Sequence, residues 1–138
     1  MSDCIFCRIV SGQIPSVRID ESPNHLAFLD IGPLAPGHTL LIPKQHFDDI
    51  RDIPPEVLSR LTTELPRLGR AILKATGATG LNILQNTGTS SGQAVFHFHI
   101  HLIPRVAQDN LGYRWNAGKY GAGEANQMQA KIIESLER

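Results

Sequence analysis

The chain has 138 residues and a mass of 15.2 kDa, which predicts one globular domain over residues 1–138. Its 13 basic and 13 acidic residues cancel and no basic run occurs, so neither a nucleic acid nor a membrane surface is an expected partner. No apolar run approaches the roughly 18 residues of a membrane helix, and the first residues lack a secretory pattern, so a cytoplasmic location is expected.

Two cysteines, Cys4 and Cys7, stand in a C-x-x-C spacing near the start of the chain. Two are too few for a disulfide scaffold, so the pair indicates half of a metal site or a redox pair. A redox motif of this kind follows a strand, for which the three upstream residues leave no room, and the metal interpretation is favoured. The alternative is that both thiols are small buried apolar groups.

Turn residues and apolar periodicity divide the first half of the chain into short elements. They predict a helix over 4–11 ended by Gly12, strands over 17–20 and 26–29 joined by a turn at 21–24, and a strand over 38–42 stopped by Pro43. Leucines and isoleucines then recur at helical spacing from Val57 to Leu73. They predict one long helix that begins at Pro54–Pro55, is kinked at Pro66 and ends at Gly77.

The second half predicts two further strands and a terminal helix. The strands cover 81–86 and 95–103, the latter ended by Pro104, and a helix over 125–138 follows an irregular segment at 105–122. Consecutive strands favour a meander. The fold class is therefore α+β, with a five-stranded antiparallel meander sheet, one long helix and short terminal helices.

Three of the six histidines, His97, His99 and His101, alternate with apolar residues in the last predicted strand. A period of two places the imidazoles on one face and the apolar side chains on the core face. One metal ion bound by all three is disfavoured, because the outer Cα atoms lie about 13 Å apart in a strand. A solvated strand face is the second alternative, and a division of the histidines between two sites is the third.

Neighbouring imidazoles suit phosphoryl chemistry without a catalytic metal. A neutral histidine can attack phosphorus, and a second can protonate the leaving group. The chain has no G-x-x-x-x-G-K-[ST] loop for Walker-type chemistry. The loop 86–93 precedes the histidines, and its Gly88 and Gly92 allow backbone N–H groups to face an anion, although the loop taken alone favours a plain hairpin connection.

The segment from His97 to Ile103 resembles the signature of the histidine triad (HIT) superfamily, preceded by Gly92-Gln93 as in that family. Similar motifs occur at 5–10, 14–15, 26–31 and 36–46, and the resemblance is closest to the bacterial histidine triad nucleotide-binding branch. It implies a HIT-like five-stranded sheet, a homodimer, and purine nucleotide binding. It also implies hydrolysis at the α-phosphorus of nucleoside phosphoramidates or related AMP conjugates through a nucleotidyl-histidine. The alternatives are a dinucleoside polyphosphate hydrolase and a catalytically weak nucleotide-binding protein.

The resemblance also assigns roles. His99 would be the nucleophile, His101 would bind phosphate and assist the leaving group, and His38 would support them. Nucleotide contacts are expected from Phe6, Ile9, Phe28, Asp30, Ile31, Asn86, Gly92, Gln93, Ala94, His99 and His101. Ala94 departs from the usual serine or threonine, which removes one hydroxyl donor to the phosphate. Tyr113 and Trp115 are packing residues or contributors to a neighbouring subunit's pocket.

The same resemblance implies two further metal ligands beside the two cysteines. Bacterial members with C-x-x-C bind a structural zinc ion, and the matching ligands here are Cys4, Cys7, His46 and His97. Two thiolates and two imidazoles make a closed tetrahedral site with no open position for chemistry. His97 would then face the metal while His99 and His101 face the phosphate.

Overall fold

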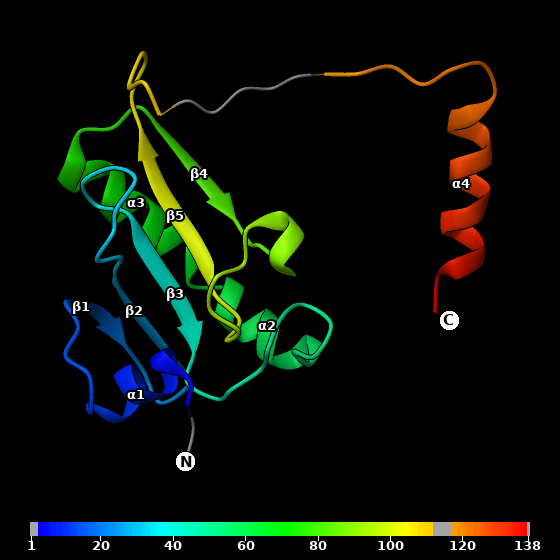
Figure 1. The fold of residues 1–138 in the computed structure, drawn as a ribbon. Coiled ribbons are helices and arrows are strands. Elements are labelled where there is room, and N and C mark those ends of the chain that lie inside the picture. Colours follow the sequence, from blue (N-terminus) through cyan, green and yellow to red (C-terminus); the bar gives the residue numbers. More distant parts are fainter. Residues whose placement is uncertain (1–2, 112–116, 138) are drawn as a thin grey trace.

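The computed structural model describes residues 3–111 and 117–137 and has an α+β architecture built on one sheet (Figure 1). The five strands run antiparallel in the order β1-β2-β3-β5-β4. Their bounds are β1 Arg18–Glu21, β2 His25–Leu29, β3 Thr39–Pro43, β4 Gly80–Leu84 and β5 Ile100–Arg105. The predicted antiparallel sheet of five strands is confirmed. The meander is interrupted once, because β5 rather than β4 lies beside β3.

The two faces of the sheet carry separate apolar clusters. Helices α2 (Pro55–Thr62) and α3 (Leu65–Thr76) cover one face, where Leu61, Leu68 and Ile72 pack on Phe98, Ile100 and Leu102. The short helix α1 (Ile5–Ser11) covers part of the other face, where Phe6 and Ile9 pack on Phe28 and Leu40. Cys4, predicted as the first helical residue, caps α1 instead, and Gly12 ends the helix as predicted, in the left-handed conformation with φ +85°.

The predicted long helix is divided in two, and the division precedes Pro66 rather than kinking a continuous helix there. The interruption at Thr63–Glu64 puts Pro66 in the first turn of α3. The N–H groups of a first turn have no acceptor within the helix, so a proline there costs no helical hydrogen bond. Gly77 ends α3 as predicted. Both helices direct their leucines and isoleucines towards the sheet, so the periodicity identified the correct buried side of each.

The predicted strand 95–103 is wrong at both ends. The ladder begins at Ile100, because Phe98 N–H donates to the carbonyl of Phe47 in the loop after β3, at 2.6 Å, instead of to a neighbouring strand. At the other end the strand continues through Pro104 to Arg105. Beyond Leu102, β5 pairs only with β4, so its edge towards β3 is unpaired. Pro104, which has no N–H to donate, is tolerated at such an edge.

The C-terminal helix α4 (Glu124–Ser135) lies away from the sheet (Figure 1). Its predicted apolar side is exposed, with Met128, Ile132, Ile133 and Leu136 between 43% and 57% accessible. Tyr113 and Trp115 lie outside the described residues. Within residues 3–111 and 117–137, no helix combines the length and apolar character that crossing a bilayer requires.

Candidate active site

The histidine segment joins two sites at its opposite ends. His99 and His101 line a cavity of about 370 Å³ between α1 and the sheet. His97 is fully buried and turns to Cys4, Cys7 and His46 instead. Phe98, Ile100 and Leu102 lie in the core under α2 and α3, so the alternation separates imidazoles from apolar residues as predicted. Phe96 is the exception, because it is 43% exposed and precedes the strand.

The cavity has both apolar and polar lining residues. It is lined by Phe6, Ile9, Phe28, Asp30, Ile31, Asn86, Gly92, Ala94, His99 and His101 from the predicted nucleotide set, and by Ile5, Ile14, Pro15, Ser16, Leu40 and Val95. The second group was missed in the sequence analysis, because most of these residues are apolar and no motif distinguishes them from core residues. Among the described side chains, only Ser16 has a buried oxygen without a hydrogen-bond partner. The other polar lining groups include the two imidazoles, one carboxylate and one amide.

Gln93 is the predicted nucleotide contact that the structure places elsewhere. Its side chain is 2% exposed, accepts from Gly88 N–H at 2.7 Å and donates to the carbonyls of Asp48 and Val95. Gln93 therefore braces the loop instead of lining the cavity. Gly92 has φ +106°, and a Cβ there would lie 3.4 Å from the Asn86 amide nitrogen, so glycine allows the loop to close on Asn86.

Hydrogen bonds determine which nitrogen each cavity imidazole presents. His99 Nδ1 lies 2.7 Å from the carbonyl oxygen of His97, which can only accept, so Nδ1 carries the proton. A neutral His99 then has its lone pair on Nε2. An imidazole with an unprotonated nitrogen at a cavity wall can act as a nucleophile.

His101 presents the opposite tautomer because of a chain of donors behind it. Leu34 N–H donates to His38 Nδ1 at 3.0 Å, so the proton of neutral His38 lies on Nε2. His38 Nε2 then donates to His101 Nδ1 at 2.9 Å, which leaves the proton of His101 on Nε2. The rings of His99 and His101 are 5.0 Å apart, centroid to centroid, so an acceptor and a donor stand side by side.

Burial keeps all three imidazoles neutral at neutral pH. It lowers the pKa of His101 to about 4, with a smaller contribution from the neighbouring His99 and His38. Burial also lowers the pKa of His99 and of His38, although Asp30 acts in the opposite direction on both. A neutral His99 retains the lone pair that nucleophilic attack requires.

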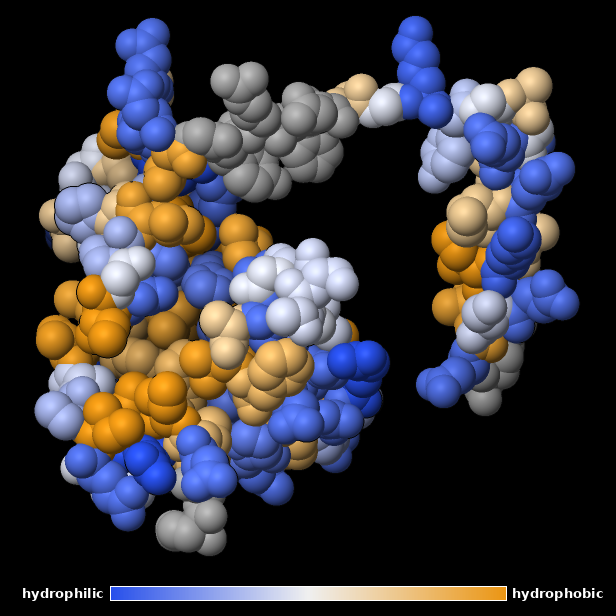
Figure 2. Space-filling view, viewed as in Figure 1, coloured by the Kyte–Doolittle hydropathy of each residue, from blue (hydrophilic) through white to orange (hydrophobic). Residues whose placement is uncertain are grey.

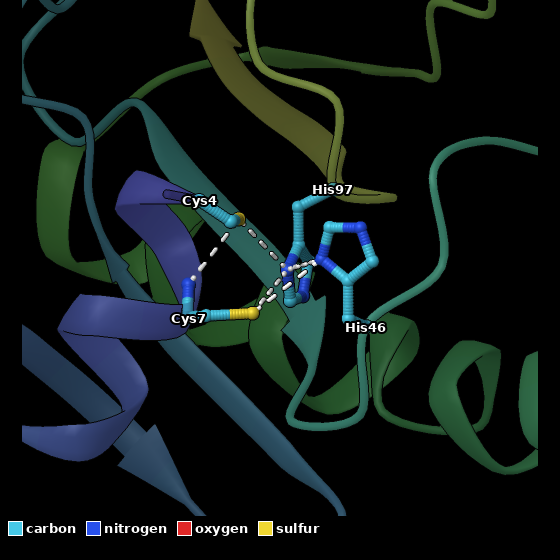
Figure 3. A group of neighbouring side chains, drawn as sticks. All are labelled: Cys4, Cys7, His46 and His97. Atoms are coloured by element: carbon cyan, nitrogen blue, oxygen red, sulfur yellow. Dashed lines mark hydrogen bonds between the residues drawn. The ribbon is translucent and has the colours of Figure 1, made fainter. Parts of the chain in front are cut away.

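The second site brings all four predicted metal ligands together (Figure 3). Cys4 Sγ lies 3.4 Å from His97 Nδ1, Cys7 Sγ lies 3.4 Å from His46 Nδ1, and the two Nδ1 atoms are 3.2 Å apart. A tetrahedral zinc site has N···N edges of about 3.4 Å and S···N edges of about 3.6 Å, given its usual bond lengths. The four atoms therefore have nearly the spacing of a zinc site.

Both cluster imidazoles turn a lone pair inward. His97 Nε2–H donates to the carbonyl of Pro43 at 2.8 Å, and His46 Nε2 lies 2.9 Å from Asp48 Oδ1. Each outer nitrogen thus carries the proton and each Nδ1 is an acceptor, which is the usual arrangement of metal-ligating histidines. Burial lowers the pKa of His97 to about 4, so protons do not compete for this nitrogen near neutral pH. The donor set fits a divalent ion with tetrahedral preference.

Comparison with known proteins assigns the family. The model of the HIT domain matches residues 11–108. The chain belongs to the HIT family. Among the relatives, the adenylylsulfatase HINT3 of Arabidopsis thaliana is 42% identical over 80% of this chain, which spans 56% of that protein's length. The adenosine 5′-monophosphoramidase HNT1 of Candida albicans is 35% identical over 98% of this chain and 92% of its own.

Solved HIT structures share the fold over nearly the whole chain. The crystal structure of a HIT family member from Bacillus subtilis matches with a TM-score of 0.93 at 36% identity, covering 99% of both chains. A zinc-bound histidine triad protein from Mycobacterium smegmatis matches with a TM-score of 0.76 at 38% identity, covering 97% of this chain and 98% of its own. The HIT-like α+β fold is therefore confirmed.

Proposed function

We propose that this HIT protein is a purine nucleotide-binding hydrolase. It cleaves nucleoside phosphoramidates or related AMP conjugates at the α-phosphorus. The observation that carries this proposal is the pair of complementary imidazoles at the cavity wall, with a lone pair on His99 Nε2 and a proton on His101 Nε2. Two relatives support the substrate class, since their names describe activities on conjugates of AMP.

The reaction proceeds in two displacements. His99 Nε2 attacks the α-phosphorus, a P–N bond to the imidazole forms, and the bond from phosphorus to the leaving group breaks. His101 donates a hydrogen bond from Nε2–H to the departing group, which takes its proton from solvent because a neutral imidazole keeps its only ring proton. Water then attacks the nucleotidyl-histidine and loses a proton to solvent, which releases AMP and frees His99. His38 acts behind them by holding the tautomer of His101.

The rest of the cavity suits a nucleotide. Phe6, Ile9 and Phe28 offer apolar walls for a purine, and Asp30 and Ile31 lie where they can contact the ribose. Asp30 Oδ1 accepts from Gly32 N–H at 2.9 Å, which orients the carboxylate to accept from ribose hydroxyls. Asn86, Gly92 and Ala94 line the cavity and would meet the phosphate; Gly92 N–H donates to the Thr89 carbonyl at 3.0 Å, and the missing hydroxyl at Ala94 removes one donor.

Cys4, Cys7, His46 and His97 hold a structural zinc ion in this proposal. Bound there, zinc supplies cross-linking between the N-terminal segment, the loop after β3 and the start of β5 rather than Lewis-acid catalysis. The spacing of the four donor atoms and the zinc-bound relative support this assignment. Residues 1–138 form one HIT domain, and its C-terminal helix α4 lies away from the sheet.

A homodimer accounts for the exposed side of α4. Figure 2 shows apolar side chains gathered on the side of α4 that faces the body of the molecule. Among the apolar residues of α4, Ile132 is 56% exposed. The match to the Bacillus subtilis crystal structure covers 99% of both chains with a TM-score of 0.93, so it extends over α4. A second copy can cover it symmetrically. Sedimentation of the full chain and of Ile132→Asp tests this, and a monomeric wild type contradicts it.

The hydrolase proposal is tested by AMP release from adenosine 5′-phosphoramidate. His99→Ala is expected to lower kcat by about 10⁴-fold or more, because the nucleophile is lost, while AMP affinity changes by only a few-fold. Equal, near-background rates for wild type and variant would instead favour a catalytically weak nucleotide-binding protein. A higher kcat/KM on diadenosine polyphosphates than on the phosphoramidate would favour the dinucleoside polyphosphate hydrolase.

A further inference from the structure

Helix α1 is a shared wall between the metal cluster and the nucleotide cavity. Cys4 and Cys7 direct their sulfur atoms to the buried His97. On the same helix, Phe6 and Ile9 line the cavity and are only 6% and 7% exposed. Because α1 has only seven residues, fixing its two cysteines also fixes the position of the two apolar side chains.

Phe6 links the two sites through its ring. Its centroid lies 5.9 Å from that of His97 and 5.1 Å from that of His99, and both pairs are edge-to-face. It also packs edge-to-face on the Phe28 ring, with centroids 5.5 Å apart. Phe6 therefore packs simultaneously on a metal ligand, the nucleophile and Phe28.

A second link runs through the backbone of His97. The side chain of His97 is held between Pro43 and the metal cluster, and its carbonyl accepts the Nδ1 proton of His99. A displacement of His97 moves this carbonyl and with it the nucleophilic ring. The link through the His97 carbonyl thus affects the orientation of the His99 ring. Phe6 affects both the His99 ring and the apolar wall of the nucleotide cavity.

Among the described residues, apolar packing and a few hydrogen bonds also hold α1 in place. Its buried residues are Phe6 and Ile9, and further hydrogen bonds run from Arg18 to the Ile9 carbonyl and from Ile14 N–H to the Arg8 carbonyl. A helix of this length is not stable by itself in water. Tetrahedral coordination is the strongest available restraint on its N-terminal turn, because structural zinc contributes directly to the free energy of folding.

From these links we infer that metal binding at Cys4, Cys7, His46 and His97 assembles the nucleotide cavity, so that the metal ion and a purine nucleotide bind cooperatively. Phe6 and His97 are the positioning residues that transmit the effect. This inference rests on the proposed zinc site and nucleotide pocket. Linkage requires that the two ligands raise each other's affinity by the same factor, and couplings of this kind are commonly 5- to 150-fold.

The test measures binding of AMP to the full chain by calorimetry, with zinc-loaded and chelator-stripped protein. AMP is expected to bind at least about fivefold more weakly to the stripped protein. The reciprocal measurement titrates zinc against a chromophoric chelator, and saturating AMP is expected to tighten zinc binding by the same factor. Hydrogen exchange at the α1 amides is expected to slow when zinc is added to the stripped protein.

Two variants separate the coupling from damage to the fold. His46→Ala removes a ligand that lies outside the cavity and off α1, and it should weaken both zinc binding and AMP binding, whereas the adjacent exposed Gln45→Ala should change neither. Phe6→Leu keeps the four ligands, so zinc should still bind while the coupling factor falls. Failure to bind zinc would contradict the metal site, and failure of both forms to bind AMP would contradict the proposed function. Binding of both with equal AMP affinity would overturn the inference alone.

Discussion

His97 and His99 are two residues apart and both buried, yet they present opposite nitrogens. His97 donates from Nε2 to the Pro43 carbonyl and offers Nδ1 to the thiols. His99 donates from Nδ1 to the His97 carbonyl and offers Nε2 to the cavity. In each case a backbone carbonyl accepts a hydrogen bond from the protonated ring nitrogen, and the other nitrogen keeps its lone pair. The same residue type thus becomes a metal ligand or a nucleophile according to which carbonyl lies beside it.

His101 extends the comparison to a third role. Its Nδ1 accepts a proton from His38, so its Nε2 is a donor where that of His99 is an acceptor. The partner of His99 is the backbone carbonyl of His97, within the triad, whereas His97 and His101 rely on Pro43 in β3 and on the His38 side chain in the loop before β3. The comparison can therefore also be tested at a position outside the triad.

The largest expected effect concerns the residue between the two imidazoles. Phe98 is 1% exposed, and Phe98→Ala should lower the free energy of unfolding by about 3–5 kcal/mol because it leaves a cavity in the core. Phe96→Ala, at a side chain that is 43% exposed, should cost less than about 1 kcal/mol. Urea unfolding of both variants measures the difference. Similar costs would mean that the alternation of buried and exposed rings does not hold.

A smaller effect is expected behind the catalytic pair. His38→Phe keeps a ring but removes the donor to His101 Nδ1, so His101 no longer has a fixed tautomer. The value of kcat for AMP release should fall about 10- to 100-fold, because His101 Nε2–H no longer has a fixed orientation towards the departing group. Zinc content, measured by elemental analysis, should stay unchanged. A variant with wild-type kcat would remove His38 from the proposed mechanism.

The lowered pKa of His101 predicts a pH-dependent stability. Its folded-state value of about 4 lies below the usual 6.5, so the unfolded chain takes up this proton first as the pH falls. The contribution is complete above pH 6.5 and is lost between pH 6.5 and about 4. With chelator present, wild type should lose about 1–2 kcal/mol more than His101→Gln between pH 7 and pH 5. Denaturant unfolding at both values decides this, and equal losses would contradict the burial argument.

The smallest expected effect is an increase in kcat/KM. Ala94 lines the cavity without a hydroxyl, and Ala94→Thr should restore one donor to the phosphate. The expected increase in kcat/KM is about 3- to 10-fold, below the roughly 1.5–3 kcal/mol limit for a hydrogen bond to a charged group. Ala94→Val has nearly the same shape without the donor and serves as the control. Equal values for the two variants would show that the hydroxyl contributes nothing.

The sequence was sufficient for the features that local physical rules determine. Periodicity located the buried sides of α2 and α3, Gly12 and Gly77 marked helix ends, and alternation separated His99 and His101 from Phe98. The resemblance to the HIT signature implied four metal ligands, and in the structure their ligand atoms lie within 4.8 Å of one another. These features depend on residue type and spacing, which the chain carries in itself.

Only the tertiary structure decided the tautomers, the beginning of β5 and the place of Gln93. Each depends on a group that is distant in the sequence: the Pro43 carbonyl for His97, the Phe47 carbonyl for Phe98, and the Asp48 carbonyl for Gln93. Backbone carbonyls are present at every residue, so no sequence pattern distinguishes the one that will accept. Folding brings β3 and the segments beside it against the histidine segment, and those contacts select the nitrogens that His97 and His101 present.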